Sequence, residues 1–317
     1  MATISLSLDE IYKLANKTLL ANGCDKETAD ILSELITNAE RDGSLSHGLF
    51  RLPAYVSGLK SGKINGKQKP NIKKLTPSVI KADGKNCLAP VVLNKSIPEL
   101  VKAAKENGVA VLAIINSHHM AAMWPETEKI ADEGLVAFAC TSYKPAVAPA
   151  GAIKPLFGTN PISFAWPRKN NTPVVYDMAT ASMAMGEVQV AKRERHKVPL
   201  GTGLTKDGKD TTDPAEIADG GVLLPFGGYK GSGIAMMVEL LAGALVGDNF
   251  SYETAAKDNN DGGPPSGGEF ILAISPDKLS DTDWDKHANE FFEKMKSMGE
   301  VRFCLLYTSD AADDLLC

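Results

Sequence analysis

The sequence is poor in cysteine, and its few thiols are badly placed for cross-links or for metal. The five cysteines are Cys24, Cys87, Cys140, Cys304 and Cys317. Their number is odd, they are widely spaced, and no two of them form a Cys-x-x-Cys pair. This pattern suggests neither a disulfide framework nor a zinc site. We therefore expect reduced thiols with mostly structural roles.

Long apolar runs and blocks of a single charge are also missing. No segment approaches the roughly 18 consecutive apolar residues of a membrane span, and the first residues do not resemble a basic and then apolar export signal. Lysine and arginine total 34 against 39 aspartates and glutamates, for a net charge of -5 without a basic block. We expect neither nucleic acid nor membrane as a partner, and we expect a cytoplasmic protein.

Two common nucleotide-binding signatures are absent as well. The segment Gly201, Thr202, Gly203 lacks the third glycine of a Rossmann fingerprint, follows no convincing strand and has no acidic residue at the required distance. The P-loop pattern is not found either. A dinucleotide, if one binds, must be held by another kind of fold.

What remains is the composition and patterning of a globular enzyme. With 317 residues, 44% of them hydrophobic and 23% charged, the chain can bury a large core and is expected to form two lobes. Apolar spacing predicts a first helix after the capping box at Ser7 and Glu10, and a second helix from Asp25 to about Arg41.

Beyond about residue 98, helices and apolar runs alternate, which predicts an α/β lobe. Predicted helices cover 98–107, 124–133, 232–246 and 283–297, and predicted strands cover 109–115, 135–140, 162–166, 174–178 and 270–274. Two polar stretches, 192–221 and 248–268, are expected to be long loops that line or cover a site. Residues 304–317 do not continue the preceding helical pattern, and we expect them to be a non-native tail.

A histidine and an arginine follow the turn at the end of the second predicted helix. If the stretch after this turn is helical, His47 and Arg51 project from one face. A guanidinium can hold a carboxylate in a bidentate way while the neighbouring imidazole gives or takes a proton, as reduction of a 2-oxo or 2-imino acid requires. The alternative is that Arg51 pairs with a surface glutamate and His47 caps a helix.

Two further histidines, His118 and His119, lie where a predicted strand opens towards a helix, which is a favoured ligand position in α/β proteins. Metal is not expected here, because adjacent side chains point apart and no His-x-x-x-His or carboxylate set accompanies them. Contact with a cofactor or simple capping is the expected role.

The segment Gly227 to Gly233 reads GGYKGSG and precedes a predicted helix. Backbone N–H groups at a helix N-terminus, with Lys230 beside them, suit a phosphate, although a tight turn between packed elements is an equal alternative. A basic cluster at Lys192, Arg193, Arg195 and Lys197 could meet a 2′-phosphate, but a solvated loop is the favoured interpretation.

Together these segments resemble the malate/L-lactate dehydrogenase family of NAD(P)-dependent oxidoreductases, over about residues 5 to 302. The resemblance is carried by SHGLFRLPAYVSGLKSGKI from Ser46, GTNPISFAWP from Gly158, VYDMATASMAMG from Val175 and the GGYKGSG turn. NSHHMAAMWPE from Asn116 is similar to the branch that reduces Δ1-piperideine-2-carboxylate and Δ1-pyrroline-2-carboxylate.

This resemblance implies an α/β protein with a non-Rossmann NAD(P)H-binding lobe on a mixed sheet and a helical substrate lobe. The substrate lobe is expected over 1–100, the dinucleotide lobe over 101–250, and 251–303 is expected to return to the first lobe. It further implies a homodimer that uses NADPH, with NADH as the alternative cofactor. Relatives end in a Leu, Pro, Gly motif that helps cover the cofactor, and this chain runs instead into FCLLYTSD.

The resemblance also implies roles for individual residues. His47 matches the proton donor, Ser46 belongs to its relay, and Arg51 matches the residue that binds the substrate carboxylate. The acidic member of the relay falls at Glu187, where close relatives carry aspartate, and Thr159 would touch the substrate. Dinucleotide contacts are implied for His119, Met120, Ala121, Ala122, Met123, Asp177, Met178, Ala179, Gly227 and Gly228, and Lys230 is added for its charge.

The implied reaction is hydride transfer to C2 of a cyclic ketimine, with the proton for nitrogen supplied by His47, which gives L-pipecolate or L-proline. The nearest alternative is a 2-hydroxy-acid dehydrogenase that acts on malate, lactate or a sugar-derived keto acid with the same residues. An alternative of another class is a non-catalytic protein that binds a ligand or metal around His118 and His119.

Overall fold

The computed structural model describes residues 4–299 and 301. The tail expected at 304–317, with Cys304 and Cys317, therefore lies outside the described residues. No helix in the described part of the chain is both long and apolar enough to cross a membrane.

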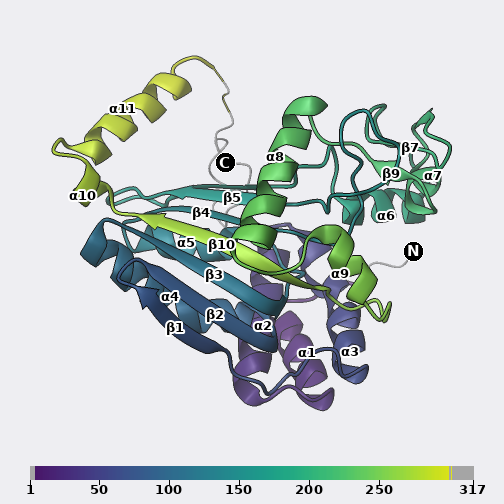
Figure 1. The fold of residues 1–317 in the computed structure, drawn as a ribbon, viewed down its shortest axis with the longest axis horizontal. Coiled ribbons are helices and arrows are strands. Elements are labelled where there is room, and N and C mark those ends of the chain that lie inside the picture. The colour runs from purple at the N-terminus through teal and green to yellow at the C-terminus, as the bar shows by residue number, and fades with distance from the viewer. Residues whose placement is uncertain (1–3, 300, 302–317) are drawn as a thin grey trace.

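A mixed sheet of seven strands organises the molecule (Figure 1). In spatial order its strands are β1 (Asn71–Thr76), β2 (Val79–Leu88), β3 (Val109–His118), β10 (Ser266–Ile274), β4 (Val136–Thr141), β5 (Ile162–Trp166) and β6 (Val174–Met178). Only β2 and β3 run parallel among the neighbouring pairs of the described strands, and α4 (Ala89–Asn107) connects them. The α/β class and the mixed sheet are thus as predicted.

Both faces of this sheet are buried, and the side chains of β10 alternate between them. Ile271 and Ala273 belong to the core under α4 and α5 (Trp124–Asp132). Phe270 points the other way, into the core shared with α8 (Tyr229–Glu239) and the π-helical turn that follows it at Leu240–Leu245. Residues on alternate faces of one strand explain why this segment reads as a continuous apolar run.

The N-terminal helices gather at one end of the sheet (Figure 1). They are α1 (Leu8–Ala21), α2 (Lys26–Arg41) and α3 (Leu52–Lys60), and their apolar stripes meet in a separate core that includes Leu19, Leu32, Ile36 and Tyr55. Ser7 and Glu10 form the predicted capping box, and Asp25 caps α2. The first two predicted helices are therefore confirmed.

A small three-stranded sheet occupies much of the stretch that we expected to be a loop at 192–221. It contains β7 (Gly203–Leu204), β8 (Asp210–Thr211) and β9 (Val222–Leu223), with α6 (Met185–Glu194) and α7 (Pro214–Ala218) beside it (Figure 1). Strands of two residues carry too little alternation to be recognised in a sequence. The second expected loop likewise contains α9 (Ser251–Lys257) and the start of β10.

The sheet crosses the lobe boundaries that we predicted at residues 100 and 250. Strands β1 and β2 precede the first boundary, which falls inside α4, and β10 follows the second. After β10 the chain continues into α10 (Pro276–Leu279) and α11 (Trp284–Lys296), which lie at the far end of the sheet from α1 to α3 (Figure 1).

Candidate active site

Ser46, His47 and Arg51 lie on two short 3-10 turns that lead into α3. The turns span Leu45–His47 and Leu49–Arg51 and are separated by Gly48, so the stretch is not the continuous helix that we assumed. A Cβ at Gly48 would lie 2.1 Å from the Glu40 carboxylate, which accepts the Leu49 N–H at 2.7 Å, so a larger residue here would displace the Glu40 side chain. This contact fixes the turn against α2.

Two hydroxyl groups hold the His47 imidazole. Nδ1 lies 3.1 Å from Ser46 Oγ and 3.2 Å from Ser44 Oγ, and no hydrogen bond of the described residues uses Nε2. Burial, followed by the positive charge of Arg51, lowers the pKa of His47 to about 3. The imidazole is therefore neutral at pH 7 and leaves Nε2 available to a ligand.

Arg51 has no carboxylate partner among residues 4–299 and 301. Its Nε is buried without a hydrogen-bond partner, and its guanidinium lies 5.5 Å from the Phe50 ring centroid. Its charge also acts on the phenols of Tyr55 and Tyr143, although burial dominates there and raises the pKa of Tyr143 to about 12. A half-buried guanidinium without a counter-ion is a ready site for an anion.

Glu187 makes no hydrogen bond to Ser46, His47 or Arg51 among the described residues. The side chain is exposed at the start of α6, and its carboxylate accepts the Ala184 N–H at 3.4 Å. The neighbouring Gly186 provides the contact with the site, since a Cβ there would lie 3.4 Å from Ser46 Cβ and 3.5 Å from Arg51 Nη2. Glu187, which the resemblance implies as the acidic relay member, thus caps its own helix in this structure.

Thr159 lies beside two other segments of the site. Its carbonyl accepts hydrogen bonds from the Thr180 N–H at 2.9 Å and from the Thr180 hydroxyl at 3.0 Å. The preceding Gly158 permits a close approach to Tyr143, because a Cβ at this glycine would lie 2.7 Å from the Tyr143 backbone nitrogen and oxygen. Thr159 is therefore connected to the tyrosine on which the Arg51 charge acts.

Hydrogen bonds bring together the three segments that the resemblance assigns to the dinucleotide. One Asp177 oxygen accepts the N–H groups of Met123 at 2.6 Å and of Trp124 at 3.1 Å, so the 177–179 segment holds the 119–123 loop at the start of α5. The Phe226 N–H donates to the Thr180 carbonyl at 3.0 Å, which places the glycine turn beside the same segment.

The glycine turn is open and positively charged. Gly227 and Gly228 have φ values of 56° and 63°, and no atom lies within 4 Å of a Cβ at either position. Lys230 is exposed and has no acidic partner in the described part of the chain. In the other basic cluster, by contrast, Lys192 pairs with Asp219 at 2.6 Å. The open space at the N-terminus of α8, together with the Lys230 charge, fits a dinucleotide phosphate.

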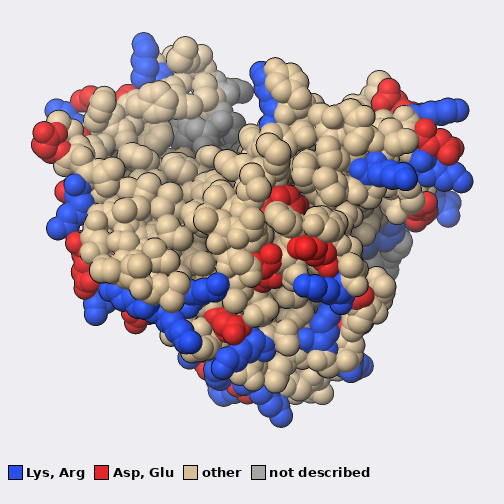
Figure 2. Space-filling view, in the orientation of Figure 1, with Lys and Arg blue, Asp and Glu red and all other residues tan. Residues whose placement is uncertain are grey.

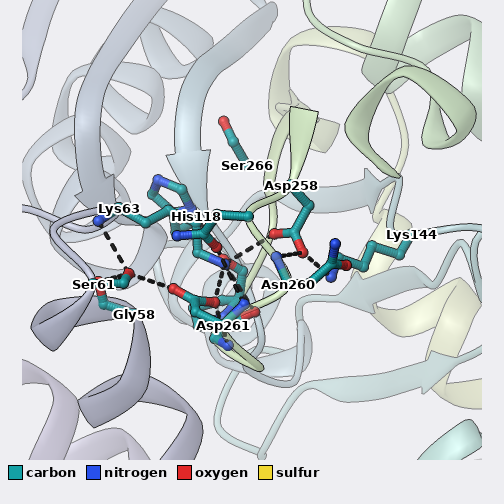
Figure 3. A network of polar contacts seen from close by, with 12 residues as sticks. Gly58, Ser61, Lys63, His118, Lys144, Asp258, Asn260, Asp261 and Ser266 are labelled. Carbon is teal, nitrogen blue, oxygen red and sulfur yellow. Dashed lines mark hydrogen bonds and ion pairs between the residues drawn. The ribbon is translucent and has the colours of Figure 1, made fainter. Parts of the chain in front are cut away.

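His118 belongs to a different network, in which the 258–264 loop joins α3 to the sheet (Figure 3). His118 Nδ1 lies 3.1 Å from the Pro264 carbonyl oxygen, and Nε2 is buried without a partner. Asp258 pairs with Lys63 at 2.9 Å and also with Lys144, while Asp261 pairs with Lys63 at 2.5 Å. The histidines that we treated as a tandem pair thus serve separate clusters.

With this geometry in place, comparison with known proteins identifies the family. The model of malate/L-lactate dehydrogenase matches residues 6–303. The chain belongs to the malate/L-lactate dehydrogenase family. This confirms the resemblance drawn from the sequence motifs.

Relatives within the family include named reductases. The Δ1-pyrroline-2-carboxylate/Δ1-piperideine-2-carboxylate reductase of Pseudomonas syringae pv. tomato is 41% identical over 300 residues, covering 95% of this chain and 88% of that protein. The Δ1-pyrroline-2-carboxylate reductase of Ancylobacter novellus is 44% identical over 273 residues, covering 86% of this chain and 80% of that protein.

Solved structures agree with this grouping. Δ1-piperideine-2-carboxylate reductase from Pseudomonas syringae superposes with a TM-score of 0.91 at 40% identity and covers 95% of this chain and 91% of its own. Sulfolactate dehydrogenase from Methanocaldococcus jannaschii superposes with a TM-score of 0.83 at 33% identity, and the match covers 94% of this chain and 86% of that one. The non-Rossmann α/β fold is therefore shared across members with different named substrates.

Sequence reasoning missed several residues around the site. Tyr55 and Tyr143 near Arg51 were not singled out, nor were Glu126 and Glu269, which lie beside His119. Glu126 falls inside a predicted helix and Glu269 just before a predicted strand, where a lone acidic residue looks like an ordinary surface position. Only their burial, at 4% and 0% exposure, marks them out.

Proposed function

We propose that this chain is an NADPH-dependent reductase of the cyclic ketimines Δ1-piperideine-2-carboxylate and Δ1-pyrroline-2-carboxylate, forming L-pipecolate and L-proline. The observation that carries the proposal is the unpaired guanidinium of Arg51 next to the imidazole of His47. Relatives at 41% and 44% identity bear the names of such reductases. The substrate class therefore contains a carboxylate attached to the carbon of a C=N bond.

Arg51 binds the substrate carboxylate and so orients C2. The carboxylate supplies the counter-ion that Arg51 lacks, and Thr159, connected to Tyr143 through Gly158, contacts the same substrate. Bidentate binding of a planar carboxylate restricts the rotation of the adjacent C=N bond. Because Arg51 is half-buried, its pairing with the substrate is stronger than an exposed ion pair would be.

His47 supplies the proton to the substrate nitrogen from Nε2. Ser46 and Ser44 hold Nδ1, which leaves Nε2 as the free position. After burial, the charge of Arg51 and then that of His119 lower the His47 pKa, and a bound carboxylate neutralises the Arg51 charge. Substrate binding thus favours the protonated imidazole that the reaction consumes. Glu187 is proposed as the acidic relay member that supports this state.

The residues that would hold NADPH fit a dinucleotide, since three chain segments meet around an open glycine turn. His119 to Met123, Asp177 to Ala179, Gly227, Gly228 and Lys230 form this set, with Lys230 facing a phosphate group. NADPH supplies the hydride when it is bound. No metal is needed for this chemistry.

We also propose that the protein is a homodimer that associates through α8. The helix and its π-helical extension expose a row of apolar side chains, with Tyr229 at 75%, Met236 at 53%, Leu240 at 51% and Leu245 at 65% exposure. Figure 2 shows few charged side chains over the neighbouring strands on this face, whereas charges gather along its lower edge and at the small sheet. Such a patch is typical of a subunit interface, and light scattering on the purified chain measures the subunit number.

The test is NADPH oxidation by the purified full chain with the two cyclic imines, and with oxaloacetate and pyruvate. We expect kcat/KM for the imines to exceed that for the 2-oxo acids. His47→Ala should lower kcat by about 100-fold or more while leaving NADPH affinity nearly unchanged, and Arg51→Ala should mainly raise KM. His287→Ala, at an exposed position on α11, is the matched control.

Several outcomes would contradict the proposal. Preference for a 2-oxo acid would make the chain a 2-hydroxy-acid dehydrogenase with the same residues. Normal turnover by His47→Ala would remove the proton-donor assignment. If Glu187→Gln left the pH profile of kcat unchanged, Glu187 would be a helix cap and nothing more.

A further inference from the structure

A second cluster of ionisable side chains lies inside the molecule, on the face of the sheet covered by α5. Glu269 projects from β10 on the same side as Ile271, Glu126 comes from α5, and His119 follows β3. Their exposed fractions are 0%, 4% and 7%. One nitrogen and two carboxylate oxygens from these residues all lie within 4.8 Å of one another.

The negative charges of two buried carboxylates must be neutralised by a proton, a hydrogen-bond donor or a cation. His119 Nε2 lies 3.4 Å from Glu126 Oε1, but both oxygens of Glu269 are buried without a hydrogen-bond partner among the described residues. No lysine or arginine in the described part of the chain pairs with either glutamate. Burial raises the pKa of Glu126 and raises that of Glu269 to about 8. A buried carboxylate without a partner is costly, so this cluster must hold either a shared proton between the two glutamates or a bound cation.

We propose that His119, Glu126 and Glu269 bind a divalent transition-metal ion, with zinc the best match. When a cation displaces the proton that burial favours, the two carboxylates and the neutral imidazole carry a charge of -2, which a divalent ion cancels. One nitrogen and two oxygens are a usual zinc donor set, whereas calcium takes six or more oxygens and magnesium keeps several waters. Zinc bonds of roughly 2.1 Å place tetrahedral ligand atoms about 3.4 Å apart, so small side-chain rotations complete the site.

A pocket gives the cluster access to solvent. It is lined by His119, Glu126 and Lys129, together with side chains of α2 and α4 such as Glu34 and Asn94. A cation can enter through this opening, and a water molecule in the pocket can occupy the fourth coordination position. The metal would link the end of β3, α5 and β10, which are three elements that only the folded chain brings together.

The proposal reverses the expectation that metal is absent around these histidines. That expectation considered only residues close in sequence, and Glu269 lies on a strand far along the chain. A metal ion at this site would affect the stability and order of the 119–123 loop, whichever substrate the enzyme uses. The test therefore needs no assay of activity.

The experiment measures zinc in the purified full chain after chelation and re-addition of Zn²⁺, by elemental analysis and by Tm in the absence of NADPH. We expect one zinc ion per chain and a Tm that rises with zinc concentration. Glu269→Gln should bind zinc at least about tenfold more weakly and lose this rise, because a neutral amide replaces an anionic ligand. Glu133→Gln, an exposed position that pairs with Lys105 elsewhere, is the matched control.

Cobalt substitution and a second variant keep the result unambiguous. Co²⁺ in the same site should give the visible absorption of a low-coordinate centre, and Glu269→Asp should retain weaker binding if Glu269→Gln does not fold. Equal zinc binding by the wild type and Glu269→Gln would overturn the proposal. A wild type that binds no zinc would also overturn it, and a more stable Glu269→Gln would then indicate that the two carboxyls share a proton.

Discussion

Replacing Asp258 by asparagine tests whether the 258–264 loop fastens α3 to the sheet. The Asp258 side chain is 2% exposed and meets Lys63, 12% exposed, and Lys144, 29% exposed. It also accepts the Asn260 N–H at 2.9 Å. Asparagine has the same shape and can still accept this N–H, so the change removes the charge with little loss of packing.

The expected cost follows from which partners remain. Breaking a buried ion pair costs about 3 to 5 kcal/mol. Lys63 keeps Asp261 and the Gly263 carbonyl, whereas Lys144 loses its only carboxylate partner in the described part of the chain. We therefore expect the lower end, about 3 kcal/mol, which corresponds to a fall in Tm of roughly 5 °C for a chain of this size.

The effect should depend on pH in a defined direction. Burial alone would raise the pKa of Asp258, but hydrogen bonds from Lys144 and Lys63 outweigh it and lower that pKa. A carboxyl with a lowered folded pKa stabilises the protein above its unfolded pKa of about 3.9, and loses this contribution as pH falls through the folded value. The difference in the free energy of unfolding between wild type and Asp258→Asn should be largest at pH 7 and should decrease below about pH 4.

Calorimetry of the wild type and Asp258→Asn measures this difference, with the exposed Asp281→Asn as control. A double-mutant cycle with Lys144→Met isolates the pair, and we expect a coupling free energy above about 1 kcal/mol. A Tm within 1 °C of the wild type, or additive effects in the cycle, would refute the idea that these ion pairs fasten the loop.

Three further predictions concern the site and the core. Gly186→Val should raise KM for the imine about tenfold, whereas Gly186→Ala should leave it nearly unchanged. A Cβ at this position lies 3.5 Å from Arg51 Nη2, so only the additional methyl groups of valine collide with the guanidinium. Equal KM values for the two variants would contradict this. The pKa of His47 is lowered to about 3, so below about pH 6.5 the imidazole takes up a proton in the unfolded chain but stays neutral in the folded chain. The free energy of unfolding should therefore fall between pH 7 and pH 5, and it should fall less in His47→Gln. Parallel curves of Tm against pH for the two proteins would contradict this. Leu112→Ala, fully buried in β3, should cost about 2 to 5 kcal/mol by denaturant unfolding, whereas Leu75→Ala, 56% exposed, should cost little.

The sequence was most informative where one chain segment carries its own signal. The predicted strands at 162–166 and 174–178 match β5 and β6 residue for residue, and the capping box fixed the start of α1. β1 was not predicted, because most of this edge strand is exposed and its apolar alternation is weak. Helix α4 starts earlier than predicted, since Pro90 fits the first turn of a helix and Pro98 does not break this one.

The site was predictable only in part for a related reason. His47 and Arg51 lie close together because only four positions separate them in the sequence, although the chain between them forms two 3-10 turns instead of one helix. The neighbourhood of His119 depends on Glu269, and the 258–264 loop meets Lys63 across most of the chain length. Contacts between distant segments are set by strand order, which local periodicity does not encode.

The position of β10 between β3 and β4 has a consequence for how the protein is made. While the ribosome synthesises residues 142–265, β3 and β4 are complete but lack the strand that joins them. Each therefore presents an unpaired edge until residue 274 has emerged, and such edges are templates for aggregation. β10 is the last of the seven strands to be made, so termination before Ser266 leaves β1 to β3 unjoined to β4 to β6 and removes Phe270, Ile271 and Ala273 from the two cores on the faces of the sheet.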